Sequence, residues 1–101
     1  QTKSFPKIGF EIKQLDDQDI KKYKIKEFTK GIVISNVKNN SKAFKSGLRE
    51  GMIIVRVGQS EVSDLSIISN AIEKAKKQKR NALLMLVNFE GTDRFVAVEI
   101  F

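Results

Sequence analysis

The sequence predicts an α+β domain, a small and partly open antiparallel β-barrel of about five strands capped by one long and two short helices. Three observations support this fold class. Runs of β-branched and other apolar residues at 31–37, 52–57 and 82–89 are typical of strands. Apolar residues at three- and four-residue steps within 64–78 predict one long amphipathic helix. A chain of 101 residues, 41% apolar and 31% charged, suits a single domain with its own core.

The first half of the chain carries the signals of two short helices. Residues 15–25 predict a helix that Asp16 caps, with acidic residues in the first turn where the helix dipole favours them. Ser41 is placed to cap a helix of one or two turns over 42–46. Gly47 can end that helix in the left-handed conformation.

The second half predicts the long helix and a hairpin. We expect Ser63 to be the N-cap of the helix over 64–78. The nearly continuous apolar run at 82–89 predicts a strand that is buried on both faces. A turn at 90–93 should lead back into a strand over 94–100, where apolar residues alternate.

The composition limits the possible functions. With no cysteine and no histidine, the chain lacks thiol nucleophiles, disulfides, histidine bases and the usual zinc ligands. We therefore expect a non-catalytic domain that needs no cofactor and no metal. The net charge of +7 comes partly from basic runs at 21–26 and 74–80, which we interpret as solvated faces, so we expect no nucleic-acid partner.

The two ends of the chain are interpreted differently. Residues 1–6 contain no apolar stretch like that of a signal peptide, and we expect them to be a linker before a domain over 7–101. No apolar run approaches the ~18 residues that a membrane span needs, so we expect no direct membrane insertion. Phe5 and Phe101, one near each end, could each fold back into a groove of the domain.

The most informative motif is Lys7-Ile8-Gly9-Phe10, an apolar–Gly–apolar step before a strand. Glycine tolerates backbone angles that other residues resist, and successive N–H groups can then form an anion-binding nest. We expect the N–H donors of this loop to be unpaired. The strand that follows, at Phe10, Glu11 and Ile12, could pair with an extended peptide at its edge.

Several segments together resemble a bacterial PDZ domain. Ile8-Gly9-Phe10 resembles the carboxylate-binding loop of that family. Asn40-Ser41-Lys42-Ala43 lies where Gly-Ser-Pro-Ala is usual, and 46–54 resembles the family's "AGL–GD–I" signature, although Met52 replaces the usual aspartate. The order of the motifs and the ending over 84–98 are similar to the last PDZ domain of an HtrA (Do-type) serine protease.

The resemblance implies a peptide-binding module of a periplasmic serine protease-chaperone. A substrate C-terminus or exposed extended segment would add as a strand, with the terminal carboxylate on the N–H groups of Ile8, Gly9 and Phe10. The residues that would form the side-chain pocket are Ile8, Phe10, Leu65, Ser69 and Ile72. Of the apolar residues on the long helix, Ile68 is expected to face the core instead.

Three other functions stay open at this point. The domain could hold the subunits of a protease oligomer together and bind little peptide. It could come from a secretion system or an intramembrane protease. Nucleic-acid binding through the basic runs is a weaker alternative, testable by its salt dependence.

Overall fold

The computed structural model describes residues 2–23 and 31–100. In chain order, the elements are β1 (Thr2–Phe5), β2 (Phe10–Gln14), α1 (Asp17–Lys22), β3 (Ile32–Val37), α2 (Lys42–Ser46), β4 (Ile53–Val57), β5 (Ser60–Glu61), α3 (Leu65–Lys77), β6 (Ala82–Phe89) and β7 (Thr92–Glu99). The end of the first expected helix, part of the basic run at 21–26, and Phe101 lie outside the described residues.

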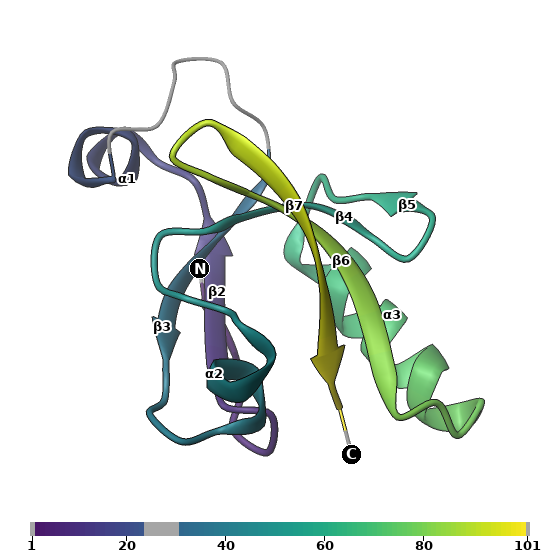
Figure 1. Ribbon diagram of the computed structural model, residues 1–101. Coiled ribbons are helices and arrows are strands. Elements are labelled where there is room, and N and C mark those ends of the chain that lie inside the picture. Colours follow the sequence, from purple (N-terminus) through teal and green to yellow (C-terminus); the bar gives the residue numbers. More distant parts are fainter. Residues whose placement is uncertain (1, 24–30, 101) are drawn as a thin grey trace.

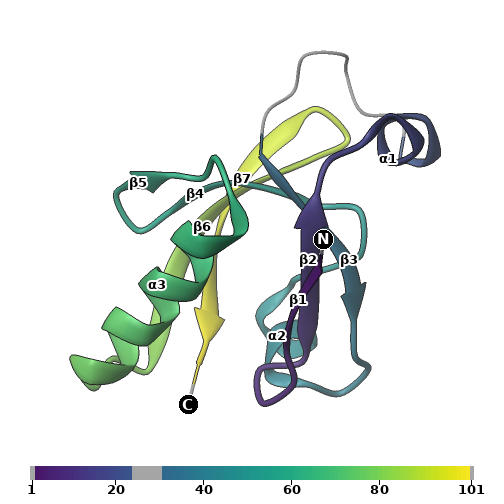
Figure 2. The same cartoon turned by 180° about the vertical axis from the view of Figure 1, so that it is seen from behind.

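The strands form one antiparallel sheet. Its order is β1-β2-β3-β4-β6-β7, and β5 pairs with β4 beyond this path. The sheet is strongly curved, so that β2 and β3 lie on one side of the molecule and β6 and β7 on the other (Figures 1 and 2). The long helix α3 covers the opening between these two parts. The predicted α+β class, with one long and two short helices, is confirmed, although the described residues form more strands than the five expected.

The predicted caps of the short helices are confirmed. Asp16 accepts from the backbone N–H of Asp19 at 2.9 Å, and the Asp19 carboxylate accepts in turn from the N–H of Asp16 at 3.2 Å, which is a capping box. The Ser41 side chain accepts from the N–H of Phe44 at 3.1 Å. Gly47 ends α2 with φ +108°. These local signals fix both helices to within a residue or two of their expected starts.

The cap of α3 was predicted wrongly. Asp64 rather than Ser63 is the N-cap, and its carboxylate accepts from the N–H groups of Ser66 and Ile67. Both residue types are good caps, and a carboxylate adds a favourable interaction with the helix dipole. The helix therefore begins one residue later than expected.

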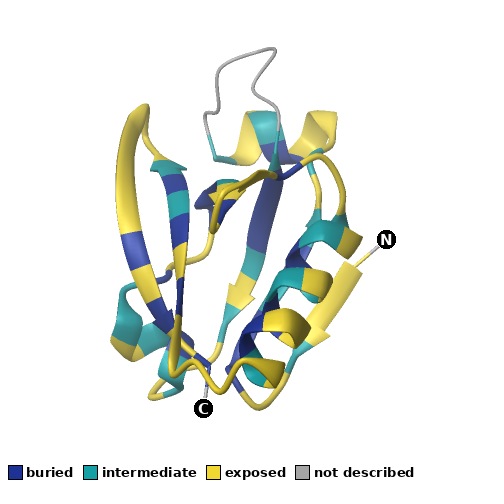
Figure 3. Ribbon diagram, turned by 90° about the vertical axis from the view of Figure 1, so that its right-hand side faces the viewer, coloured by how far each residue is buried: buried dark blue, intermediate teal, exposed yellow. Residues whose placement is uncertain are grey.

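The strand β6 is also not buried on both faces. Its residues alternate, with Leu83, Met85 and Val87 buried, whereas 49% of Leu84 is exposed. Figure 3 shows this alternation along the β6–β7 hairpin. The outer face remains open because α3 covers only the inner face of this part of the sheet. Ile68, expected to face the core, is fully buried there together with Ile72 and Ala75.

The largest difference from expectation is at the beginning of the chain. The segment expected to be a linker contains β1, which pairs with β2 in the register Thr2↔Lys13 to Phe5↔Phe10. Three of its four residues are exposed, and only Phe5 packs partly against the core. This strand was missed because it is short, polar and followed by proline, so its structure depends on pairing with β2 rather than on local preference.

Candidate functional site

The loop between β1 and β2 is centred on Gly9. This residue has φ +99°, in the left-handed region that disfavours residues with a side chain. A Cβ atom built on Gly9 would lie 2.1 Å from the Cβ atom of Ser41, closer than two such atoms can approach. Gly9 is therefore required for two reasons, its backbone angle and its close packing against the start of α2.

The carbonyl groups of this loop are held by the segment that begins α2. The N–H of Ala43 donates to the carbonyl of Ile8 at 2.9 Å, and the N–H of Lys38 donates to that of Gly9 at 2.8 Å. The first N–H groups of a helix have no partner within the helix. The loop supplies a partner for Ala43, and Ser41 supplies one for Phe44. Because the carbonyl groups of Ile8 and Gly9 face the segment that begins α2, the N–H groups of the same loop face the opposite side.

Two of those N–H groups bind a carbonyl of the chain itself. Ile8 and Gly9 donate to the carbonyl oxygen of Phe5 at 3.1 and 2.7 Å. The expectation that these donors are unpaired was therefore wrong. The reason is that β1 folds back onto β2 through the short turn at Pro6 and Lys7, which brings the end of β1 onto the loop.

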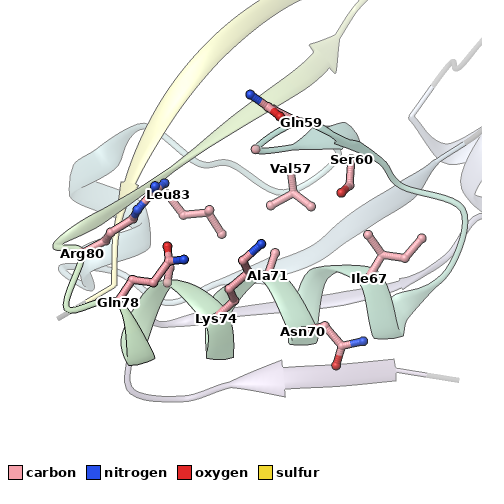
Figure 4. Close-up of a pocket in the computed structure, with 12 residues that line it drawn as sticks. Val57, Gln59, Ser60, Ile67, Asn70, Ala71, Lys74, Gln78, Arg80 and Leu83 are labelled. Atoms are coloured by element: carbon pink, nitrogen blue, oxygen red, sulfur yellow. The ribbon is translucent and has the colours of Figure 1, made fainter.

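The edge of β2 is also paired. β1 runs antiparallel to β2 on the side away from β3. Figures 3 and 4 show β1 beside α3 and running in the same direction as the helix. The ring of Phe5 stacks on that of Phe10, with centroids 5.0 Å apart. The strand thus lies where the sequence analysis expected an incoming peptide, with Phe5 at the end that meets the loop.

The residues predicted to form the side-chain pocket have different degrees of burial. Ile8, Phe10 and Ile72 are buried and belong to one apolar cluster, against which Leu65 packs with partial exposure. Ser69 is also partly exposed. Three further residues were predicted for the loop and for strand pairing. The side chain of Lys7 is exposed, that of Glu11 is partly exposed, and that of Ile12 is buried.

The far end of β2 is anchored by charge. The ammonium of Lys13 lies 3.3 Å from the Asp16 carboxylate and 3.2 Å from that of Asp19. Hydrogen bonds to these two carboxylates raise the pKa of Lys13 above its usual value. The backbone N–H of Asp19 and the nearby ammonium lower the pKa of Asp16. This ion cluster joins α1 to β2.

A cavity lies on the other side of α3. It has a volume of about 570 Å³ and lies between the helix, the turn after β4 and the start of β6 (Figure 4). Its floor is apolar, with Val57, Ile67 and Leu83, and Lys74 and Arg80 contribute the charges. None of the described residues that line it is acidic. Sequence reasoning did not predict this cavity.

Two residues of the candidate site were also missed or undervalued. Phe5 was considered only as a residue that could fold into a groove, whereas its carbonyl and its ring both occupy the site. Ser41 was interpreted only as a helix cap, but it also forms the surface on which Gly9 packs. The signal for Phe5 was available, because an aromatic residue before proline ends an extended segment close to the loop.

Comparisons with known proteins identify the family to which this chain belongs. The PDZ domain family matches residues 3–88. A probable periplasmic serine endoprotease, DegP-like, from Bartonella henselae is 38% identical over 71 residues, which are 70% of this chain and 14% of that protein. A protein of the same description from Rickettsia conorii is 27% identical over 97 residues, 96% of this chain and 18% of its own length. The chain thus spans less than a fifth of these relatives.

Solved structures share the fold. The HtrA3 PDZ domain bound to a phage-derived ligand (FGRWV) superposes with a TM-score of 0.71 at 23% identity, covering 98% of this chain and 86% of that one. The HtrA-type protease AlgW with a decapeptide gives 0.67, also at 23% identity, over 91% of this chain and 27% of that one. The loop at Gly9, the strand order and these matches lead to one conclusion: the chain belongs to the PDZ domain family and is related to the PDZ domains of HtrA/DegP-like serine proteases.

Proposed function

We propose that this domain binds peptides by strand addition to the edge of β2. The observation that carries the proposal is the loop at Gly9, whose Ile8 and Gly9 N–H groups converge on one carbonyl at the end of an extended, antiparallel strand. A peptide's terminal carboxylate would take the place of that carbonyl. Hydrogen bonds to a charged group contribute about 1.5–3 kcal/mol each, more than bonds to a neutral carbonyl.

The side chains beside the loop favour apolar ligands. The last side chain of the peptide would lie over Ile8, Phe10 and Ile72, with Ser69 at the edge, and burying one such chain contributes about 1.5–3 kcal/mol. Leu65, at the start of α3, cannot hydrogen-bond to a hydroxyl group. We therefore expect apolar side chains at the last and third-last positions. After the costs of ordering and association, the balance corresponds to micromolar binding, about −8 kcal/mol.

The wider setting of this function is part of the proposal. The relatives are described as periplasmic serine endoproteases, and the two related structures are described with peptide ligands. On this basis we assign the chain to a periplasmic HtrA/Do-type protease-chaperone, as its last PDZ domain, where it would bind unfolded or C-terminal segments of substrates. The domain itself would be non-catalytic and would need no cofactor.

An amide-shift titration with a short apolar peptide tests the proposal. The peptide should shift the amide signals of Ile8, Gly9 and Phe10, and amidating its C-terminus should weaken binding at least tenfold because the carboxylate is lost. The carbonyl of Phe5 occupies the same donors, and its ring stacks on Phe10. The titration is therefore done both on the chain and on its Phe5→Ala variant, which loses the ring and keeps the carbonyl. The absence of shifts at these three amides in both proteins, at millimolar peptide, would contradict peptide binding.

A second function is supported by a different observation. On the outer face of the β6–β7 hairpin, 49% of Leu84 and 68% of Phe95 are exposed, and the register places Leu86 opposite Phe95 and Leu84 opposite Ala97. Such an apolar patch is typical of a contact surface. The alternative is a structural domain that holds neighbouring subunits of the parent protease together. It predicts that Phe95→Asp in the full-length protein disrupts the oligomer while the domain stays folded.

A further inference from the structure

We propose that β1 is a built-in competitor for the peptide groove, and that Phe5 is its anchor. This inference rests on the proposed function, because it assigns an occupant to the same site. A ligand would bind only when β1 leaves the edge of β2. The alternative is that the β1–β2 hairpin is a permanent part of the fold, and the experiments below separate the two.

Three contacts place β1 in the position of a ligand. Its backbone pairs with β2 from Thr2↔Lys13 to Phe5↔Phe10, which uses the edge that strand addition requires. Its last carbonyl accepts from Ile8 and Gly9, the donors proposed for a carboxylate. Its last side chain stacks on Phe10 and packs against the apolar cluster. All three elements of recognition are therefore occupied at once.

The same contacts show why β1 can be displaced. Thr2, Lys3 and Ser4 are exposed, so Phe5 alone contributes substantial apolar burial. A neutral carbonyl occupies the loop, whereas a competing peptide would present a charged carboxylate and gain stronger hydrogen bonds. When only a fraction of the molecules is open, the apparent dissociation constant increases by the inverse of that fraction. Weakening β1 should therefore tighten peptide binding without any new contact.

The occupied position also indicates the ligand class. Since the site holds a phenylalanine ring at the loop, it should accept free peptides that end in an aromatic residue. The most direct probe is the peptide Thr-Lys-Ser-Phe with an acetylated N-terminus and a free C-terminal carboxylate, which has the sequence of β1. The free peptide thus offers as a separate molecule the strand that β1 provides within the chain.

The first experiment removes the anchor. We expect Phe5→Ala to bind the Thr-Lys-Ser-Phe peptide about tenfold or more tightly than the unmodified chain, measured by the amide shifts of Ile8 and Gly9. Phe89→Ala is the matched control, because it removes an exposed phenylalanine from β6. It should leave the affinity unchanged. Equal affinities of Phe5→Ala and the unmodified chain would overturn the proposal.

The second experiment locks the strand in place. Ser4 and Glu11 are Cα partners across the β1–β2 pair, and the chain has no cysteine of its own, so Ser4→Cys with Glu11→Cys can form one defined disulfide. The oxidised protein should bind the peptide at least tenfold more weakly than the same protein after reduction. Equal binding in the two states would overturn the proposal, and so would a double variant that stays reduced under oxidising conditions.

These results separate the two proposals. If the peptide binds to none of these proteins, including Phe5→Ala and the reduced double variant, the proposed function fails. If it binds equally well to all of them, including the oxidised variant, the domain binds peptide but β1 is not its competitor. If Phe5→Ala and the reduced variant bind more tightly than the unmodified and oxidised proteins, respectively, both proposals are supported.

Discussion

The two sides of α3 differ in what they offer a ligand. The groove side is defined by Leu65, Ser69 and Ile72. There the N–H donors of the loop at Gly9 converge, and β1 pairs with the edge of β2. On the cavity side, defined by Ile67, Asn70, Ala71 and Lys74, there is an open volume of about 570 Å³.

The difference teaches that open volume and a proposed strand-addition site lie on different sides of the same helix. A peptide that adds as a strand needs backbone partners and a place for one side chain, and it does not need a deep hole. The cavity side has an apolar floor and two cationic residues. On the groove side, β1 pairs with β2, and the carbonyl of Phe5 accepts from the N–H groups of Ile8 and Gly9.

A large effect is expected from substituting the glycine that shapes the groove side. Gly9→Ala should lower the free energy of unfolding by about 3 kcal/mol, because the new Cβ atom clashes with Ser41 and the backbone angle is unfavourable. Urea denaturation measures this change. Gly47→Ala is the control, since Gly47 has a similar φ of +108° but no atom within 4 Å of the added Cβ. It should lose only about 1–2 kcal/mol from strain. Equal losses at the two positions would refute the packing argument.

A second pair of substitutions should separate the two sides of α3 directly. Ile72→Ala should cost about 2–5 kcal/mol, because Ile72 is 1% exposed within the core behind the groove. Ile67→Ala, on the cavity side, should cost about 1 kcal/mol because Ile67 is only partly buried. Urea denaturation of both variants provides the comparison. The distinction fails if truncating Ile67 costs as much as truncating Ile72.

The smallest effect concerns Asp64, which caps the helix common to both sides. Hydrogen bonds from the Ser66 side chain and backbone lower the pKa of Asp64, and the N–H of Ile67 contributes as well. Because the folded pKa is below that of the unfolded chain, about 3.9, the cap stabilises the protein above this range and the stabilisation is lost as the pH falls further. Asp64→Ala should therefore lower the urea midpoint at pH 7, and the difference should shrink as the pH falls below about 3.9.

Asp64→Asn is the matched control for that measurement. Asparagine is also a good N-cap, so the urea midpoint of this variant at pH 7 should be close to that of the unmodified chain. Its cap should contribute the same stability at low pH, because the amide does not titrate. A difference between Asp64→Ala and the unmodified chain that stays constant from pH 7 to pH 2 would contradict the role of the carboxylate.

Much of the fold could be predicted from the sequence because its signals are local. Asp16, Ser41 and Gly47 mark helix ends, and a helix end depends mainly on neighbouring residues. The burial of one face of β6 could not be predicted in this way. Its apolar run is compatible with covering on either face, and only the position of α3 decides which face is covered.

The candidate site was predicted in part for the same reason. The glycine at its centre and the strand after it are visible in the sequence as a local pattern. The partner of that strand is not, because antiparallel pairing depends on contacts between segments and a polar stretch such as Thr2–Phe5 has no strong preference of its own. The sequence thus predicted the loop and the strand of the candidate site but not the segment that pairs with them.

The position of β1 at the very edge of the sheet has a consequence for how the domain could work. Among the residues that the structure describes, β2 alone pairs with it, and none of the residues of β1 is fully buried. When β1 lifts away, the pairings of β2 with β3 and of β6 with β7 can persist, and the apolar interior stays closed to water apart from the place vacated by one aromatic ring. Under the proposed function, the groove would empty and fill while the rest of the sheet keeps its pairing, so changes in a few residues of β1 would tune the affinity for peptide.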